Sequence, residues 1–133
     1  MGLVPNKTYI GKFPTFEAVP ESLMKFWLLG LNDGDGTITA NYDKNKWHNR
    51  IVGNELVCRG VHDFIEKALQ IPVSIGIVHK SKVEGGHNTW AITIHGHENL
   101  KKYLKWLYSD ATIFLKRKYD KYQQFLKMNP EIQ

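Results

Sequence analysis

The stretch LLGLNDGDG at residues 28–36 ends an apolar segment with an unusual combination of three glycines and two aspartates. Each glycine costs a helix about 1 kcal/mol relative to alanine. Gly30 and Gly34 are four residues apart and therefore share one helix face. Two small residues there would let a second helix approach closely. Alternatively, Gly34 and Gly36 end the helix in a turn, and the pattern alone leaves both interpretations open.

The two aspartates lie where the helix is expected to end. The negative end of a helix dipole disfavours carboxylates such as Asp33 and Asp35. A hard divalent cation would offset this cost, because it takes carboxylate and backbone carbonyl oxygens. If two copies of the helix crossed, two Asp35 carboxylates would meet, and their repulsion would also favour a metal. The alternative is a solvated Asp-Gly turn.

Apolar periodicity on either side of this stretch predicts an α+β protein. Helices are expected at residues 20–32, 62–69, 98–108 and from after 110 to about 127, and strands at 37–43, 47–59, 73–81 and 89–95. This order predicts one four-stranded antiparallel sheet with helices on one face and an open second face. The domain is expected to span residues 21–127, after an arm or linker at 1–20 and before a tail at 128–133.

The strand faces that point away from the predicted core are rich in Thr, Asn, Lys and His. Alternate residues of a strand share one face, and a polar open face on a basic protein fits a groove of duplex DNA. We therefore expect one set of side chains to lie in the major groove. They are Thr37, Thr39, Asn41, Asp43, Lys44, Lys46, Asn49, His79, Thr89, Ala91 and Thr93.

Composition narrows the class of protein. The 133 residues fit one domain, and 18 Lys and Arg against 13 Asp and Glu give a net charge of +5. This excess favours a polyanionic partner, either nucleic acid or an anionic membrane. The single cysteine, Cys58, excludes an internal disulfide. No apolar run approaches the roughly 18 residues of a spanning helix, and no secretory signal is visible, so we expect a soluble intracellular protein without a membrane partner.

A basic cluster occupies the last part of the chain. Residues 101–127 contain eight Lys and Arg against two acids. A solvated helix face explains the lysines at 101–105 about as well as phosphate binding does. It explains the run at 116–118 less well, because apolar residues flank that run on both sides.

Residues 28–36 resemble the LAGLIDADG motif of a family of homing endonucleases, differing mainly at Leu29, Asn32 and Gly34. A second segment, WLYSDATIFLKRKYD at 106–120, is similar to a C-terminal signature of bacterial and phage members. The resemblance covers about residues 4–126 and includes the order of strands and helices. Two separated motifs in the right order make it specific.

The resemblance implies an αββαββα fold in which the motif helices of two domains pack as a central pair. The interface residues would be Leu28, Gly30, Leu31 and Gly34. Asp35 would bind the catalytic metal, expected to be Mg²⁺, with help from the backbone carbonyl of Gly34. Asp33 would support the helix end.

Basic residues complete the implied site. Lys118 would lie near the scissile phosphate, with Lys116 as the second choice. Lys116 and Arg117 would contact DNA. Arg59, expected near the end of the second strand, would contact the water network of the active site.

The implied activity is metal-assisted hydrolysis of phosphodiester bonds in a long double-stranded DNA target. One motif is half of an active site, so the partner would be a second copy on near-palindromic DNA or the other half of a two-motif protein. The opening residues 2–8 resemble a connector between two such halves. Two other functions stay open on the same fold: an RNA-binding intron maturase and a DNA-binding regulator that does not cut.

Overall fold

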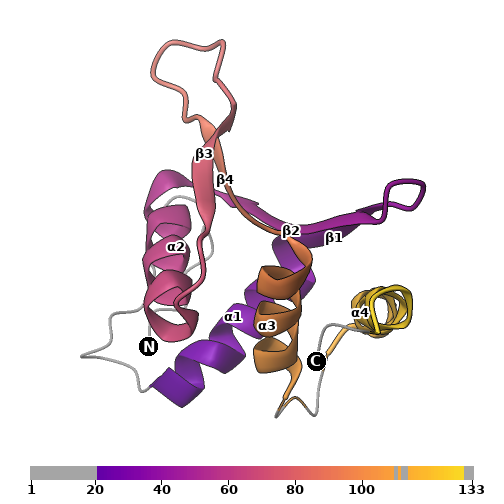
Figure 1. Cartoon of the computed structure of the whole chain (residues 1–133). Helices are drawn as coiled ribbons and strands as arrows, with labels where there is room; N and C mark the ends of the chain where they lie inside the picture. The colour runs from indigo at the N-terminus through magenta and orange to yellow at the C-terminus, as the bar shows by residue number, and fades with distance from the viewer. Residues whose placement is uncertain (1–20, 110, 112–113, 131–133) are drawn as a thin grey trace.

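The computed structural model describes residues 21–109, 111 and 114–130, and the expected arm at residues 1–20 lies outside them. Four helices and four strands are described, in the order α-β-β-α-β-β-α-α that the periodicity predicts. They are α1 (Glu21–Asp35), β1 (Gly36–Asn41), β2 (Lys46–Gly53), α2 (Glu55–Leu69), β3 (Ser74–His79), β4 (Thr89–His95), α3 (His97–Tyr108) and α4 (Lys116–Met128) (Figure 1).

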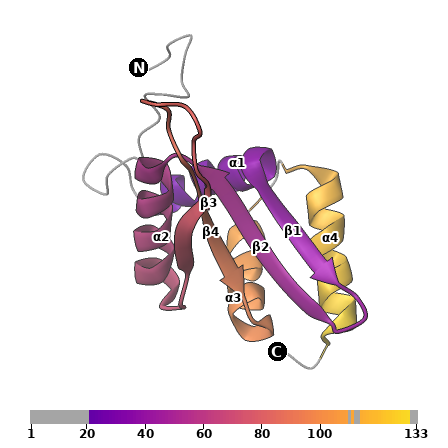
Figure 2. The ribbon, with the colours of Figure 1, turned by 90° about the horizontal axis from the view of Figure 1, so that it is seen from above.

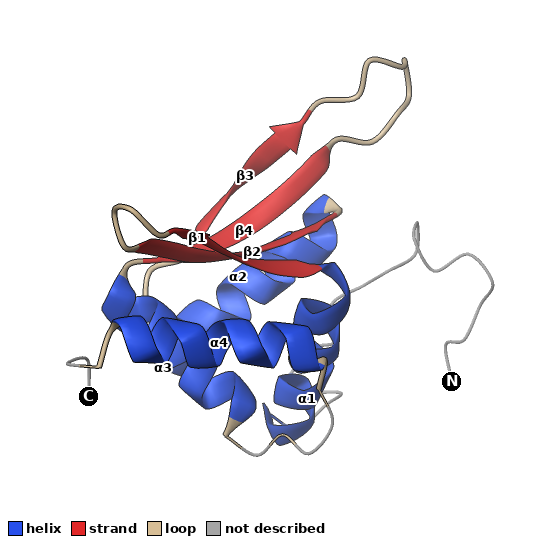
Figure 3. Cartoon of the chain, turned by 90° about the vertical axis from the view of Figure 1, so that its right-hand side faces the viewer, coloured by secondary structure: helices blue, strands red, loops and turns tan. Residues whose placement is uncertain are grey.

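The strands form one antiparallel sheet in the order β1-β2-β4-β3. The described helices lie on one side of this sheet, and none of them covers the other side (Figure 3). The expected α+β architecture is therefore confirmed.

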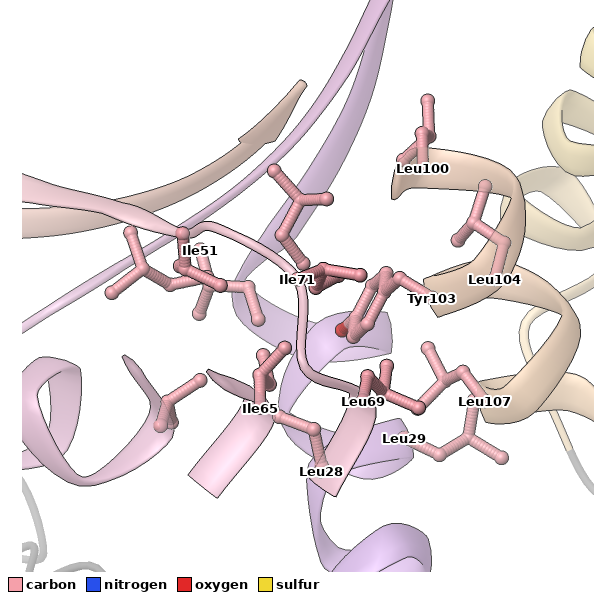
Figure 4. Close-up of a cluster of buried hydrophobic side chains, with 14 of the residues drawn as sticks. Leu28, Leu29, Ile51, Ile65, Leu69, Ile71, Leu100, Tyr103, Leu104 and Leu107 are labelled. Atoms are coloured by element: carbon pink, nitrogen blue, oxygen red, sulfur yellow. The ribbon is translucent and has the colours of Figure 1, made fainter. Parts of the chain in front are cut away.

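The core fills the space between the inner face of the sheet and the helices. Side chains from α1, α2, α3 and β2 converge there (Figure 4). Leu28 and Tyr103 are fully buried in this cluster, and Ile51 of β2 faces them from the sheet. None of the helices that the structure describes has the length and apolarity needed to cross a bilayer.

The second strand is shorter than expected, and the prediction that it reaches Arg59 is wrong. β2 ends at Gly53, and the next helix begins at Glu55. The Asn54 side chain accepts a hydrogen bond from the Val57 N–H at 2.8 Å, which caps the helix. Glu55 in the first turn adds a favourable charge. These local signals start α2 seven residues earlier than the apolar pattern suggests.

The segment around the acidic stretch also differs at its ends. α1 runs to Asp35, and β1 starts at Gly36 without a connecting loop. β1 ends at Asn41, so Asp43 lies in the turn between β1 and β2. The alternation had placed it on the strand, and that prediction is wrong. Asn45 takes a left-handed conformation in this turn, with φ of 50°.

Helix α4 braces the β1–β2 turn. Lys121 donates to the Tyr42 hydroxyl at 2.6 Å, and Asn45 donates to the Asn129 side chain at 2.9 Å. Asn129 is buried although the segment from residue 128 is expected to be a tail. These contacts hold α4 beside β1, next to the end of α1.

Candidate functional site

The two aspartates of the acidic stretch lie in different environments. Asp33 is buried, and its Oδ2 atom accepts a hydrogen bond from the Leu115 N–H at 2.9 Å. This bond joins the end of α1 to the segment that leads into α4, in keeping with the supporting role expected for Asp33. Asp35 is exposed at the last position of the helix. Only the second carboxylate is therefore placed to meet a ligand.

Lys118 of α4 binds the end of α1. Its ammonium donates to the carbonyl oxygens of Asn32 at 2.8 Å and Asp33 at 2.6 Å, and to that of Gly36. The carbonyls at a helix end lack intrahelical partners and carry the negative end of the dipole, so a cation stabilises them. Partial burial lowers the pKa of Lys118, an effect that Asp33 and Asp35 oppose.

A hollow of about 420 Å³ opens beside this helix end. It contains one carboxylate, that of Asp35, and three cationic side chains. This excess of positive charge suits the binding of an anionic group beside Asp35. The lining residues are Gly34, Asp35, Gly36, Thr37, Ile38, Arg117, Lys118 and Lys121. Of these, Lys121 was not among the residues expected from the sequence, although its spacing from Arg117 and Lys118 places it on the same helix face.

Lys116 does not line the hollow. Its side chain is 86% exposed and pairs with Asp120 at 2.8 Å, one turn along α4. A pair of this kind on an exposed helix contributes little to stability. Between the two lysines considered for the site, the structure brings Lys118 to the acidic helix end and leaves Lys116 outside it.

The open face of the sheet continues from the hollow along β1. Thr37, Thr39 and Asn41 are exposed and alternate as expected. Their partners on β2 are Arg50, His48 and Lys46, in that order. Figure 2 views the strands from this open side.

The central strands extend the same rows. His48 lies opposite His95 of β4, and Arg50 lies opposite Thr93. Partial burial lowers the pKa of His48, and the neighbouring Arg50 and His95 lower it further. His48, Arg50 and His95 were missed from the sequence, although the period of two from the buried Trp47 predicts which β2 residues face outward.

Asn49 of β2 was expected on the open face of the sheet, and this prediction is wrong. It is 0% exposed on the inner side, and its Nδ2 atom donates to Asn32 Oδ1 at 2.7 Å. Strand alternation puts Asn49 opposite in direction to His48 and Arg50. It therefore cannot lie in a groove of DNA bound to the open face.

Four other expected contact residues lie at the edges of the sheet. Asp43 and Lys44 are exposed in the β1–β2 turn, and Lys46 is exposed at the start of β2. His79 is exposed at the end of β3, where the pairing with β4 shifts register between Ile77 and His79. The turn and strand residues border the open face.

Arg59 lies on α2, so its expected place at a strand end is wrong. Its guanidinium pairs with Glu55 at 2.7 Å and lies 5.0 Å from the centre of the Trp90 ring. It is not one of the residues that line the hollow.

The exposed side of α1 is apolar and contains the small residues. Leu23 and Phe26 are 54% and 46% exposed, and a Cβ added at Gly30 or Gly34 would meet no atom within 4 Å. Leu31 is half-buried and packs against the core. Leu28, also expected at the interface, is fully buried in the core of its own chain. The prediction for Leu28 is therefore wrong, because its helix face points at the sheet.

Metal ligands are sparse within one chain. Among the described residues, no three His, Cys, Asp or Glu side chains come close enough together to hold a metal ion. The end of α1 offers one exposed carboxylate, that of Asp35, and backbone carbonyls. The carbonyl of Gly34 is not one of the three that Lys118 binds.

Scans against protein-family models and against curated proteins find no match. Solved structures do match. The homing endonuclease I-TnaI is similar with a TM-score of 0.54 and 17% identity, over 77% of this chain and 69% of that one. The LAGLIDADG homing endonuclease I-LtrWI, solved with its target DNA, is similar with a TM-score of 0.53 and 13% identity, over 81% of this chain and 37% of that one. At such identities the likeness establishes the fold, and the expected fold is confirmed.

Proposed function

We propose that this chain, which has the fold of the LAGLIDADG homing endonucleases, is a DNA endonuclease that hydrolyses phosphodiester bonds at a specific site in a long duplex. The observation that carries the proposal is the environment of Asp35. Its exposed carboxylate lies at a hollow lined by Arg117, Lys118 and Lys121. Asp35 directly precedes β1, whose outward side chains belong to the polar open face. A DNA backbone that crosses this point would meet cations on one side and a single carboxylate on the other.

The donor set at this point fits Mg²⁺ as the cofactor. This ion prefers oxygen ligands, keeps several waters and takes one or two carboxylates together with phosphate oxygens. One chain offers the Asp35 carboxylate and the Gly34 carbonyl, so it would supply part of the coordination and the DNA would supply more. When bound, Mg²⁺ would supply the Lewis-acid chemistry that activates water at neutral pH.

The basic residues have separate tasks in this proposal. Lys118 uses its ammonium donors on two carbonyls of α1 and on that of Gly36 in β1, so it would act by charge and by holding the helix end, and not by a hydrogen bond to phosphate. Arg117 is exposed in the same hollow and would bind a phosphate directly, because guanidinium matches its oxygens. Fixed positive charge there stabilises the charge that develops on the phosphate during hydrolysis.

The open strand face would bind the duplex and select the target. The row formed by Thr37, Arg50 and Thr93 and the row formed by Thr39, His48 and His95 run across the strands. Arginine that reaches the O6 and N7 atoms of guanine gives strong discrimination between bases. We assign direct base contacts to this face and phosphate contacts to Lys44 and Lys46 at its border.

A second copy of α1 would complete the site. The exposed stripe with Leu23, Phe26, Gly30 and Gly34 supports pairing through this helix, since glycines allow close approach. A symmetric dimer would recognise near-palindromic DNA. Because this chain spans 37% of the length of I-LtrWI, the alternative partner is a second domain of a longer protein.

The test is to incubate the protein with a library of random duplex DNA and Mg²⁺, and to sequence the ends that appear. We expect ends that cluster at one long, near-symmetric sequence, and none when EDTA replaces Mg²⁺. A protein that enriches a duplex sequence without cutting it would be a regulator. One that binds structured RNA and not duplex DNA would be a maturase. Either result would contradict the proposal.

A further inference from the structure

Asn32 is a fully buried polar residue in the last turn of α1. It stands where the motif LAGLIDADG has isoleucine. Burying an amide is costly unless it is hydrogen-bonded, so its partners decide what it contributes. They come from three different elements.

The side chain of Asn32 joins β2 and α3 to α1. Its Oδ1 atom accepts hydrogen bonds from Asn49 Nδ2 at 2.7 Å and from the Tyr103 hydroxyl at 3.2 Å. Burial raises the pKa of Tyr103 far above its ordinary value, so the hydroxyl remains protonated and can donate. The backbone oxygen of Asn32 meanwhile accepts from Lys118 of α4.

The junction of α1 and β1, directly after Asp35, packs tightly against Asn32. A Cβ added at Gly36 would lie 2.6 Å from the backbone oxygen of Asn32 and 2.7 Å from its Oδ1. Asp35 directly precedes Gly36, so any shift of Asn32 would be passed to the carboxylate within one turn. Tight packing of this kind transmits small displacements.

The network is not arranged for maximal stability. Within the described part of the chain, Asn32 Nδ2 and Asn49 Oδ1 are buried without a hydrogen-bond partner. A buried polar group left unpaired costs free energy, and replacing a buried polar network by apolar side chains is often neutral or stabilising. Departures of this kind from optimal packing are expected mainly at functional sites.

We propose that Asn32, Asn49 and Tyr103 form a positioning network that sets the place of Asp35 for metal binding, which rests on the function proposed above. Hydrogen bonds are directional, so they fix the rotation and depth of the helix end more closely than apolar contacts do. None of the three residues touches DNA or metal in this assignment. They act through Asp35.

The test replaces the whole network, because a single change would leave its partners unpaired. The triple variant Asn32→Ile, Asn49→Val, Tyr103→Phe should have a free energy of unfolding at least as large as that of the wild type. Its affinity for Mn²⁺, titrated by electron paramagnetic resonance on the DNA complex, should nevertheless fall at least tenfold. Its maximal cutting rate should fall by a similar factor, with the affinity for DNA changed less than twofold.

A matched control is Asn129→Leu, which removes another buried amide at the far end of α4. It should lower stability and leave Mn²⁺ affinity unchanged. A folded triple variant that binds Mn²⁺ and cuts like the wild type would overturn the positioning role. If the wild type binds Mn²⁺ but never cuts, the proposed function fails, and the Mn²⁺ affinities still decide the role of the network.

Discussion

The end of α1 and the open face of the sheet are built in opposite ways. At the helix end, Asn32 and Asp33 are buried, and Lys118 binds backbone oxygens on both sides of Asp35. On the strand face, residues such as Thr39 and Arg50 are exposed to solvent. Hydrolysis needs groups held in one geometry, whereas base recognition needs side chains that can reach a partner. Under the proposed function, this difference predicts that cutting and DNA binding can be changed separately by mutation.

Lys118→Met should give the largest effect that leaves DNA binding almost intact. It removes both the charge in the hollow and the bonds that hold the carbonyls of α1, so we expect cutting to fall by about 100-fold or more. Lys116→Met is the matched control, since it removes the same charge two residues earlier on α4, outside the hollow. Single-turnover cleavage at saturating protein measures both. Equal losses would remove the distinction between the helix end and the surrounding basic surface.

Gly30→Leu should abolish pairing through α1 and keep the fold. Nothing lies near a Cβ at Gly30, and leucine favours a helix over glycine by up to about 1 kcal/mol, so the variant should unfold at a higher denaturant concentration. Sedimentation should give monomers where the wild type gives dimers, with the dissociation constant of the dimer raised about 100-fold. Gly30→Ala should show an intermediate loss. A wild type that is monomeric on its DNA would contradict the shared site.

Arg50→Ala and Lys44→Ala should separate base reading from phosphate binding on the strand face. Arg50 lies in the row between Thr37 and Thr93. Its loss should remove about 1–3 kcal/mol of discrimination between bases, at one position of the target only. Lys44 is exposed in the β1–β2 turn. Its loss should weaken binding to all DNA sequences alike and reduce the salt dependence of the affinity by about one unit of slope. Binding measured on single-base variants of the target at several salt concentrations would reveal either pattern.

His48 should make DNA binding mildly dependent on pH. Its lowered pKa, caused by burial, Arg50 and His95, keeps the imidazole neutral near pH 7 in the free protein. Nearby phosphates would favour the charged form, so binding would take up a proton and tighten as pH falls from about 7.5 to 6, by at most about tenfold per unit for one proton. His48→Gln should flatten the dependence. An unchanged slope in that variant would assign the effect to other groups.

The sequence predicts the arrangement better than it predicts which face some residues occupy. Apolar period and element order are enough for the sheet, whereas the choice of Asp35 over Asp33 as the metal ligand depends on the resemblance to the LAGLIDADG motif. Asn49 was misplaced because polar character was taken for exposure, whereas the residue serves a buried bond to Asn32. Leu28 was misplaced because a helix apolar on most sides does not reveal which side faces the sheet. The contacts of Lys118 depend on α4 returning to α1 across the fold, which no local pattern contains.

The measurement that tests the central claim most directly is a pair of assays on Asp35→Asn. DNA affinity is measured by gel shift in metal-free buffer, and cleavage of the same target is measured after Mg²⁺ is added. Because DNA affinity depends mainly on basic contacts to phosphate, the variant should bind at least as tightly as the wild type. Without the carboxylate that holds the metal, it should cut neither strand. Undiminished cleavage by Asp35→Asn would contradict the assignment of the end of α1 as the catalytic centre.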